Sequence, residues 1–573
     1  MRVMTGRTMT GRSRAATPSG QTGYRCAPMS LRKLLPALLL LACLLAPAAQ
    51  AAPDQASVIM DDDQLLYRGD SAMTRALVTG KALGAESVRA TVLWRTVAEG
   101  ANLTAAQIKR LKGAKKAKAR LQKKRFRPAD PRTYPTRNWD RFDNLVKTAT
   151  NMGLRVYFTL TAPGPAYAHR VAPPSQRANA GTYKPIPSRF RAFVTAVGKR
   201  YTGQYRDENA IRRKLPRVSL WSIWNEPNQA GWLSPQWETV NGQNVPASPA
   251  LYRQLFWAGR QGLAASGHGT DVLLLGETAP MGSPLRGPRN GLRPVPFLRE
   301  LVCVGPNNQQ YTGADATRRH CGDFAKNGPL KAFAYAHHPY TKKAAPTIAP
   351  KAPDELTMAN LGLLGKLLDG LSAASGGKIP ANLPIVLTEM GYESNPPDPR
   401  NGIPLAKQAD YNALAEFIAY NDPRVKATTQ FLLRDGAPLT KYPVGSRLYW
   451  FTYQSGLYTL AGKAKPAAVA YAFPFVTFPA GPGTSGFWGQ LRFRANGRKD
   501  AAQAYWRATS DGKTTVCGNV AAGWLPVGLP MATDFRGYFT GSVPTPGPGG
   551  EYCAAFFDPA KAKITHQSLP AKP

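Results

Sequence analysis

Short apolar runs alternate with amphipathic helical stretches along most of the chain. In the helical stretches apolar residues recur at spacings of three and four, as in Phe142, Leu145, Val146 and Ala149. Repeated strand–helix units predict a parallel sheet with helices packed against it. The runs that predict strands are Ser57–Met60, Val88–Trp94, Leu154–Leu160, Val218–Trp224, Val272–Leu275, Ala332–Ala336, Ile385–Thr388 and Thr429–Leu433.

These eight runs favour one closed (β/α)8 barrel, the TIM barrel of the α/β class, over an open doubly wound sheet. No Gly-x-Gly-x-x-Gly phosphate loop follows any of them, which argues against a dinucleotide-binding fold. We therefore expect residues 52–475 to form the barrel domain.

The pattern changes after Pro466, where helical periodicity stops. Residues 476–485 are rich in Pro and Gly and predict a linker, and residues 486–558 predict a small β-sandwich. A further strand is expected at Leu448–Tyr453, and residues 559–573 are expected to be a frayed tail.

The N-terminal region has the features of a secretory signal. Arg32 and Lys33 precede an apolar run from Leu34 to Ala49, and Ala49-Gln50-Ala51 is a small-x-small cleavage site. We expect residues 1–51 to be a signal peptide, with Met29 as an alternative start that would make residues 1–28 a mis-assigned extension. An uncleaved membrane anchor is the alternative, although the run is short for a bilayer span. No later stretch predicts a transmembrane segment, so the protein is expected to be secreted, extracellular or associated with the cell envelope.

The composition is globular but strongly basic. The 573 residues are 43% hydrophobic and 19% charged, with a net charge of +40. The densest basic run, residues 109–127, contains eleven Lys and Arg and no acid. It is either a solvated insertion in one loop or an arm that binds an anionic cell-envelope polymer. No nucleic-acid motif accompanies it, so no nucleic-acid partner is expected.

Four cysteines remain after the predicted cleavage site. Their order predicts two local disulfides, Cys303–Cys321 and Cys517–Cys553, in an oxidising compartment. No Cys-x-x-Cys occurs, so no structural zinc site is expected.

Two predicted strands end in carboxylates. The fourth runs into Trp224-Asn225-Glu226-Pro227-Asn228, and the seventh ends at Thr388-Glu389. In a (β/α)8 barrel the carboxyl ends of the strands meet at one mouth, so Glu226 and Glu389 are expected to face each other. A protonated and an ionised carboxyl group on either side of a glycosidic bond are what glycoside hydrolysis requires.

With these motifs the chain resembles the clan A retaining glycoside hydrolases, closest to families 39 and 5 and to bacterial cellulase-like proteins of unassigned substrate. The resemblance implies that Glu226 is the acid/base, Glu389 the nucleophile, and Asn225 a partner of the sugar 2-hydroxyl. It also implies an arginine near the end of the second strand that holds the nucleophile. Arg89 lies early on that strand, and Arg95 is the alternative.

Other candidate substrate-binding residues follow the remaining strands. His338 and Tyr340 match a His-x-Tyr motif of family 5, which implies that Tyr340 bonds the nucleophile and that His338 contacts sugar or positions Glu226. Glu277 ends the fifth strand and either binds sugar or forms a structural ion pair. His337 and His338 are not expected to bind a metal together, because neighbouring strand residues point to opposite faces. Candidate aromatic platforms are Trp94, Tyr167, Trp232, Trp237 and, in place of a tryptophan after the eighth strand, Trp450.

The expected activity is hydrolysis of O-glycosidic bonds of a poly- or oligosaccharide by a retaining double displacement. No cofactor and no metal are expected, because two carboxylates suffice for the reaction. Two alternatives remain open. One is a transglycosylase or a catalytically weak polysaccharide-binding surface protein, and the other is a polyanion-binding envelope protein that uses the barrel as a scaffold.

Overall fold

Eight parallel strands close into a barrel, as the sequence predicts. The computed structural model describes residues 54–573 except 211, 447, 495–496, 498 and 509–515. The predicted signal peptide lies outside the described residues. In sequence order the barrel strands are β1 (Ala56–Met60), β2 (Ser87–Leu93), β3 (Arg155–Thr161), β4 (Leu220–Ile223), β7 (Val272–Thr278), β8 (Ala334–His337), β9 (Ile385–Met390) and β12 (Val425–Phe431).

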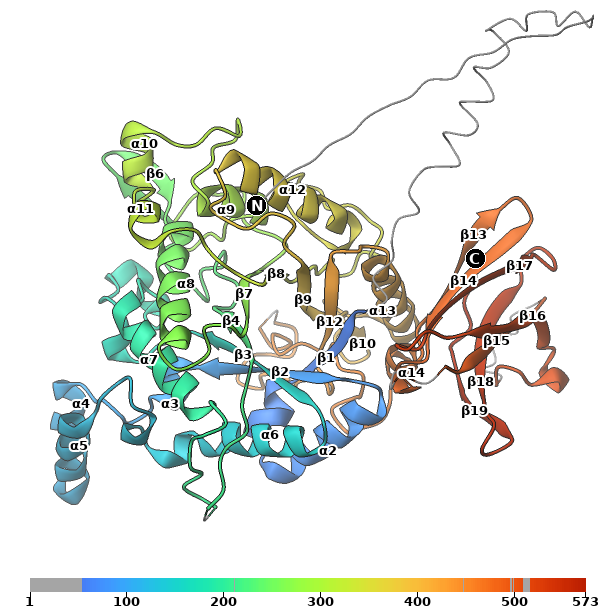
Figure 1. Cartoon of the computed structure of the whole chain (residues 1–573), viewed down its shortest axis with the longest axis horizontal. Helices are drawn as coiled ribbons and strands as arrows, with labels where there is room; N and C mark the ends of the chain where they lie inside the picture. The colour runs from blue at the N-terminus through green and yellow to red at the C-terminus, as the bar shows by residue number, and fades with distance from the viewer. Residues whose placement is uncertain (1–53, 211, 447, 495–496, 498, 509–515) are drawn as a thin grey trace, which may run out of the picture. The chain divides into compact units, whose positions relative to one another are not determined.

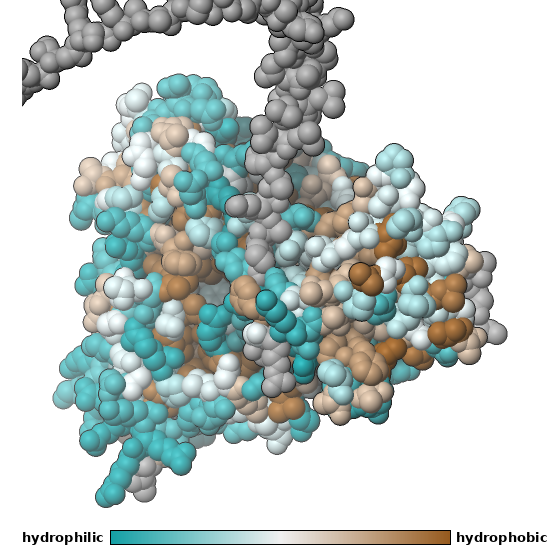
Figure 2. Space-filling view, turned by 45° about the vertical axis from the view of Figure 1, so that its right-hand side comes forward, coloured by the Kyte–Doolittle hydropathy of each residue, from teal (hydrophilic) through white to brown (hydrophobic). Residues whose placement is uncertain are grey.

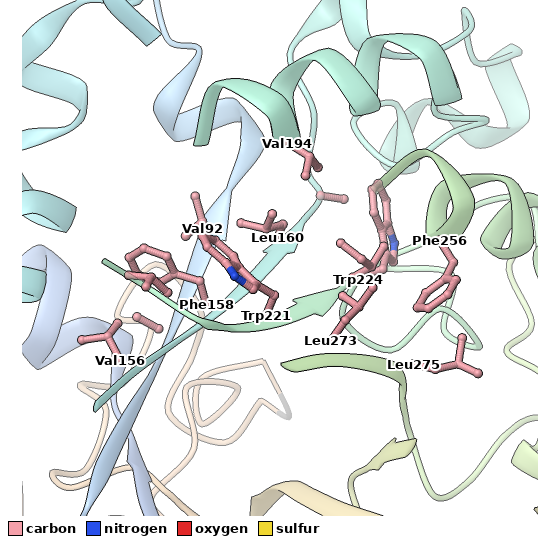
Figure 3. Close-up of a cluster of buried hydrophobic side chains, with 14 of the residues drawn as sticks. Val92, Val156, Phe158, Leu160, Val194, Trp221, Trp224, Phe256, Leu273 and Leu275 are labelled. Carbon is pink, nitrogen blue, oxygen red and sulfur yellow. The ribbon is translucent and has the colours of Figure 1, made fainter. Parts of the chain in front are cut away.

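The strands are buried on both faces, which is why most of them read as nearly continuous apolar runs. Outward-facing side chains pack under the surrounding helices in one large core. Figure 3 shows part of it, where Phe158, Trp221 and Trp224 lie among aliphatic side chains from neighbouring strands.

Helices surround the ring of strands (Figure 1). They include α2 (Asp70–Ala82), α6 (Asp140–Asn151), α7 (Pro187–Arg200), α8 (Ser248–Ala264), α9 (Pro294–Leu301), α12 (Leu361–Ala374), α13 (Leu405–Tyr420) and α14 (Pro466–Ala472). In the part of the chain that the structure describes, none of the helices combines the length and the apolar character needed to span a bilayer.

The eighth strand begins earlier than the sequence predicts. The prediction placed it at Thr429–Leu433, whereas β12 runs from Val425 to Phe431. Polar residues occupy its buried centre, and Thr428 is satisfied there by a hydrogen bond of 2.9 Å to Glu416. Because buried threonines break the apolar pattern, the sequence shows only the end of this strand.

Insertions enlarge several loops at the carboxyl ends of the strands. After β2 come α3 (Trp94–Val97), α4 (Ala105–Lys109) and α5 (Gly113–Arg125), so the basic run is largely helical. After β4 comes a hairpin of β5 (Trp237–Val240) and β6 (Gln243–Pro246). The short pair β10 (Ser394–Asn395) and β11 (Ile403–Pro404) follows β9. Helices α10 (Gly313–Arg318) and α11 (Asp323–Asn327) instead come after α9, in the connection that leads into the amino end of β8.

The C-terminal residues form two facing antiparallel sheets, as the predicted β-sandwich requires. Apolar side chains from both sheets form one core. One sheet contains β13 (Phe475–Gly481), β14 (Thr484–Gln490) and β17 (Tyr538–Pro544). The other contains β16 (Leu525–Ala532), β15 (Ala501–Arg507), β18 (Glu551–Asp558) and β19 (Lys563–Gln567).

Three boundary predictions are corrected here. Residues 476–485 are not a linker, because they form most of β13 and the start of β14, with the Pro-Gly content at the turn between them. The tail contributes β19, which pairs with β18. The expected strand at Leu448–Tyr453 is a series of turns in the loop after β12.

The sandwich packs on α13 of the barrel. The rings of Phe417 and Phe478 stack at 5.3 Å, and Arg492 forms a buried ion pair of 3.0 Å with Glu416. Its outer surface keeps exposed apolar residues such as Leu529 and Phe557. Figure 2 shows brown patches on the right, where these strands come forward, and a second brown area in the left-centre, with hydrophilic residues mainly around the rim and at the lower left.

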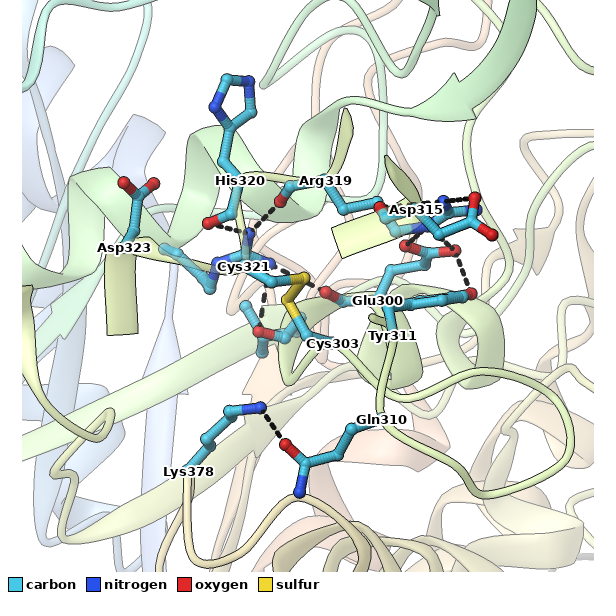
Figure 4. Close-up of a disulfide and its surroundings, with 12 residues drawn as sticks. Glu300, Cys303, Gln310, Tyr311, Asp315, Arg319, His320, Cys321, Asp323 and Lys378 are labelled. Carbon is cyan, nitrogen blue, oxygen red and sulfur yellow. Dashed lines mark hydrogen bonds and ion pairs between the residues drawn. A yellow bond between two sulfur atoms is a disulfide. The ribbon is translucent and has the colours of Figure 1, made fainter. Parts of the chain in front are cut away.

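Both cysteine pairs are joined as the sequence predicts. Cys303 and Cys321 have Cα atoms 5.9 Å apart, and those of Cys517 and Cys553 are 6.0 Å apart. Figure 4 shows the first disulfide beside Glu300, whose carboxylate accepts hydrogen bonds from Tyr311 and Arg319. It closes a loop in the connection between α9 and β8, and the second lies within the sandwich.

Candidate active site

The two candidate carboxylates meet at the carboxyl-terminal mouth of the barrel. Glu226 lies in the turn after β4, and Glu389 lies in β9. One oxygen of each and a ring nitrogen of His338 all lie within 4.8 Å of one another. The side chain of Glu226 is 21% exposed and that of Glu389 is 10% exposed. The pair is therefore held tightly and reaches solvent, as a site that binds a ligand requires.

Arg89 is the centre of the polar network below this pair. Its Nη1 donates to Glu389 Oε1 at 2.8 Å, and its Nη2 donates to Asn225 Oδ1 at 2.9 Å and to Glu277 Oε2 at 2.8 Å. Although Arg89 lies early on β2, its long side chain runs up inside the barrel to the mouth. Arg95, the alternative from the sequence, is exposed on α3.

Arg89 is fully buried, so it positions Glu389 and does not contact a substrate directly. Burial opposes its positive charge, but the carboxylates of Glu277 and Glu389 outweigh this effect and raise the pKa of Arg89 above its usual value. The guanidinium therefore keeps its positive charge beside both carboxylates.

Glu277 is a structural partner of Arg89, so the expectation that it binds sugar is corrected. Its side chain is fully buried, its Oε1 accepts hydrogen bonds from Tyr157 and Thr159, and its Oε2 accepts one from Arg89. The backbone explains this orientation. Glu277 is the extra residue of a β-bulge between β7 and β8, and Gly276 has a φ of 113° where a Cβ would lie 2.6 Å from the Ala336 carbonyl oxygen.

His338 and Tyr340, after β8, contact the two carboxylates directly. His338 Nδ1 is hydrogen-bonded to Glu226 Oε1 at 2.9 Å and lies 3.6 Å from Glu389 Oε2. Tyr340 Oη donates to Glu389 Oε2 at 3.0 Å. Because the His338 side chain is fully buried, it positions Glu226, and the alternative of a sugar contact is corrected.

The surroundings of these two residues shift their titration. Burial lowers the pKa of His338, but the charge of Glu389 and the hydrogen bond to Glu226 outweigh it, so the pKa lies above its usual value. Burial, then the charge of Glu389, raises the pKa of Tyr340 well above its usual value. Tyr340 is thus a permanent donor to Glu389, and His338 retains its proton to higher pH than a free imidazole.

The backbone that presents Glu226 is strained. Trp224 and Glu226 have φ angles of 74° and 38°, in the left-handed region that non-glycine residues rarely adopt. Hydrogen bonds from Glu226 N to the Glu277 carbonyl, 2.9 Å, and from Asn225 N to Thr161 Oγ1, 3.1 Å, hold this turn. Strain of this kind persists where the surroundings fix a functional side chain.

The predicted aromatic platforms differ in their burial. Trp94 is fully buried and its ring stacks on Phe193 at 5.3 Å, so its assignment to substrate binding is corrected. The sequence places Trp94 after a strand but does not show that its ring turns outward under α7. Trp232 and Trp450 are half-buried on loops after β4 and β12, and Trp450 packs edge-on against Tyr449 at 4.9 Å.

A different aromatic series leads from Glu389 to the surface. The ring of Phe431 lies 6.1 Å from Tyr340 and 5.4 Å from Tyr453, and Tyr453 lies 5.9 Å from Phe451. Tyr453 is 41% exposed and Phe451 is 53% exposed. Sequence reasoning missed Phe431 and Tyr453. Phe431 could have been predicted, because it is an aromatic residue at the end of the eighth strand, where side chains reach the mouth.

Sequence reasoning also missed an acid at the end of β1. Asp62 accepts a hydrogen bond of 2.9 Å from Thr91 N, and burial raises its pKa to about 6, with Glu389 among the charges that contribute. Asp61, its neighbour, accepts from the backbone of Leu433 and Arg434 and joins the ends of β1 and β12. The sequence does contain an indication of this acid, because three successive aspartates, Asp61 to Asp63, follow the first strand.

Glu226, His338 and Glu389 are also close enough to share a metal ion. However, both oxygens of Glu389 already accept hydrogen bonds from Arg89 and Tyr340. The guanidinium at 2.8 Å places a positive charge where a metal ion would need to bind. His337 does not join this group, because its two ring nitrogens bond Thr278 and the Leu356 carbonyl. The geometry therefore fits acid–base and nucleophilic chemistry better than metal ligation.

Comparisons with known proteins give structural neighbours only. No family model matches the chain, and no curated protein sequence matches it. Its fold is similar to that of a family 39 glycoside hydrolase from Bacteroides cellulosilyticus WH2, at 12% identity and a TM-score of 0.43, over 88% of this chain and 81% of that one. It is also similar to a monomeric beta-xylosidase from Caulobacter crescentus CB15, at 13% identity and a TM-score of 0.41, over 86% and 95% of the two chains. A third is GH5_18 from Streptomyces cattleya, at 15% identity and a TM-score of 0.37, over 74% and 79%.

Proposed function

We propose that this protein hydrolyses O-glycosidic bonds of an oligo- or polysaccharide by a retaining double displacement, with Glu389 as nucleophile and Glu226 as general acid and base. The observation that carries the proposal is the meeting of these two carboxylates at one accessible mouth, with their nearest ligand atoms within 4.8 Å. Carboxyl groups about 5–5.5 Å apart are typical of retaining enzymes, whereas inverting enzymes leave room for a water.

The neighbours of the two carboxylates give them different roles. Glu389 accepts hydrogen bonds from Arg89 and Tyr340, which stabilise it as an anion that can attack carbon. Glu226 is hydrogen-bonded to His338, which connects it to a group that can supply the proton it delivers. One carboxylate is therefore prepared to attack and the other to protonate.

The reaction then follows in two steps. Glu389 forms a bond to the anomeric carbon while the bond from that carbon to the leaving oxygen breaks, and Glu226 gives this oxygen its proton. In the second step Glu226 takes a proton from water, the water oxygen attacks the anomeric carbon, and the bond to Glu389 breaks. The net reaction consumes one water and releases the sugar with its original anomeric configuration.

Two further features supply sugar contacts in this proposal. Asn225 precedes Glu226, and because Arg89 holds its Oδ1, its Nδ2 can donate to the hydroxyl next to the reacting carbon. Tyr453 and Phe451 offer exposed aromatic faces, on which the C–H faces of a pyranose ring can stack. In this proposal Asn225 binds the sugar through a hydrogen bond, and Tyr453 and Phe451 bind it through stacking.

We also propose that the protein is secreted. Two disulfides within the described residues support an oxidising compartment, where such bonds persist. The signal-like N-terminal sequence supports the same interpretation.

The test is a screen of chromogenic glycosides and polysaccharides with the wild-type protein, followed by Glu226→Gln and Glu389→Gln on the best substrate. We expect each change to lower kcat by at least about 10²-fold, the lower end of general acid–base effects. Glu99→Gln, at an exposed position, is the matched control and keeps full activity. Unchanged activity in either active-site variant would refute the assignment, and products longer than the substrate would indicate transglycosylation.

A further inference from the structure

The basic helix α5 is the strongest unexplained feature outside the catalytic mouth. Seven of its thirteen residues, Gly113–Arg125, are Lys or Arg, and none of its residues is buried. Lys109, Arg110, Lys112 and Arg127 extend the cluster on both sides, and residues 109–127 contain no acid. We call residues 109–127 the basic arm.

The basic arm has no internal source of charge compensation. No ion pair joins any of its cations to a carboxylate of the described chain. Like charges lie one turn apart at Lys116 and Arg120 and again at Arg120 and Lys124. Such pairs destabilise a helix, and a helix of this length without a buried face is marginal in water. Neutralisation by an external polyanion would remove this repulsion.

The arm is nevertheless fixed at both ends to the barrel. Ile108 and Phe126, which flank α5, are both buried. The ring of Phe126 packs against Tyr134 at 5.0 Å and against Tyr167 at 5.6 Å, and Tyr167 in turn contacts Trp94 at 6.2 Å. Two aromatic residues expected to bind sugar thus anchor the arm.

The anchoring places the arm with the loops that surround the mouth. It is part of the insertion after β2, and Tyr167 belongs to the loop after β3, so both attach at the carboxyl ends of barrel strands. Residues 162–186 of the β3 loop carry the exposed Arg170 and Arg177 and contain no acid, whereas Lys184 in the same loop pairs with Glu238 at 2.5 Å. Figure 1 shows α4 and α5 at the periphery, outside the ring of strands. Cations therefore extend from the periphery to the loops of the mouth.

We infer that the basic arm binds an anionic polysaccharide, and that the substrate is an acidic glycan that reaches from the arm to the mouth. Only the identification of the substrate as an acidic glycan rests on the proposed glycosidase function, whereas binding by the basic arm does not. A carboxylate-bearing polysaccharide matches the arm by charge and the mouth by chemistry, which a nucleic acid or a phospholipid surface does not.

The test compares two sets of four substitutions in the full chain. The arm variant is Lys115→Gln, Lys118→Gln, Lys123→Gln and Lys124→Gln, all at exposed positions where glutamine keeps helix propensity. The control variant is Lys326→Gln, Lys331→Gln, Lys366→Gln and Lys407→Gln, which removes four exposed cations elsewhere on the barrel. Circular dichroism and thermal unfolding establish that both are folded, and a Lys→Arg version of the arm set is expected to bind like wild type.

Binding is measured against polygalacturonate, alginate and hyaluronan, with neutral dextran, duplex DNA and phosphatidylglycerol vesicles as comparisons. We expect the arm variant to bind at least one acidic polysaccharide about tenfold more weakly than the control variant, with a smaller dependence of affinity on salt. Equal binding by the two variants, or binding of DNA or vesicles with no binding of any acidic polysaccharide, would overturn the inference.

One further variant distinguishes a failure of polysaccharide binding by the basic arm from a failure of the proposed glycosidase function. Glu389→Gln is expected to bind the acidic polysaccharide as wild type does, because the arm is remote from the nucleophile. Turnover of a small neutral aryl glycoside is expected to be unchanged in the arm variant, whereas turnover of the acidic polymer falls through a higher KM. Binding of the acidic polysaccharide without any turnover would contradict the proposed glycosidase function but support polysaccharide binding by the basic arm. Turnover of the acidic polymer with an unchanged KM in the arm variant would contradict a role of the basic arm in substrate binding but support the proposed glycosidase function.

Discussion

Arg89 and Glu389 lie 300 residues apart in the sequence, and their side chains form an ion pair of 2.8 Å inside the barrel. The same guanidinium also holds Glu277, and with it the bulged end of β7. One buried cation therefore joins three strands of the barrel and positions the carboxylate proposed as nucleophile.

Replacing Arg89 should cost stability as well as activity. Arg89→Met leaves two buried carboxylates without their cation, and breaking such a pair typically costs about 3–5 kcal/mol in free energy of unfolding. Adding Glu277→Gln removes one uncompensated charge, so the double variant should recover part of this loss in urea unfolding while remaining inactive. A double variant no more stable than Arg89→Met would contradict the charge balance described here.

The pH profile should depend on His338. The active form in our proposal has one proton on the Glu226–His338 pair, and the raised pKa of His338 keeps this proton to above the usual imidazole range. Two coupled sites together hold their last proton to a higher pH than either alone. In His338→Asn the alkaline limb of kcat/KM should therefore move to lower pH. An alkaline limb that stays in place or moves upward would argue against a shared proton.

The disulfide between Cys303 and Cys321 should contribute measurably to stability. It closes a loop with a sequence separation of 18 residues, for which chain-entropy estimates give about 3 kcal/mol. The double variant Cys303→Ser/Cys321→Ser should lower the free energy of unfolding by about this amount in non-reducing urea titrations. Wild-type protein should lose at least as much when dithiothreitol is added. A variant as stable as wild type would mean that the hydrogen bonds around Glu300 alone hold this loop.

Arg492 should act as the link between the sandwich and the barrel. It is buried, pairs with Glu416 of α13 at 3.0 Å and donates to the Tyr471 carbonyl at 2.7 Å. Arg492→Met leaves Glu416 buried without its partner, so we expect a loss of about 3–5 kcal/mol on unfolding. Arg132→Met is the control, because the pair of Arg132 with Asp130 is exposed and should contribute little. Equal effects of the two changes would show that the link is not needed.

The sequence predicted the barrel well, because a parallel strand buried on both faces leaves an unmistakable apolar run. It predicted β12 poorly, since Thr428 is polar and is satisfied by Glu416 within the core. The turn between β13 and β14 was taken for a linker because Pro and Gly serve both purposes.

For the site, the sequence identified the end of the barrel but not the depth of each side chain. The sequence pointed to Glu226 and Glu389 because a carboxylate that follows an apolar strand is expected at the mouth, and these two side chains do meet there. Glu277 has the same pattern, yet the bulge at Gly276 turns it into the interior, and a bulge depends on how β7 pairs with β8. Trp94 was misplaced for a similar reason, since α7 covers it.

The central claim, that Glu389 attacks the anomeric carbon, is tested most directly by trapping its adduct. A 2-deoxy-2-fluoro glycoside with a good leaving group, made from whichever sugar the screen identifies, slows the second step more than it slows the first. Mass spectrometry of the digested protein should then find the sugar on the peptide that contains Glu389. A sugar attached to Glu226 or to another residue, or a first product of inverted configuration, would contradict the account.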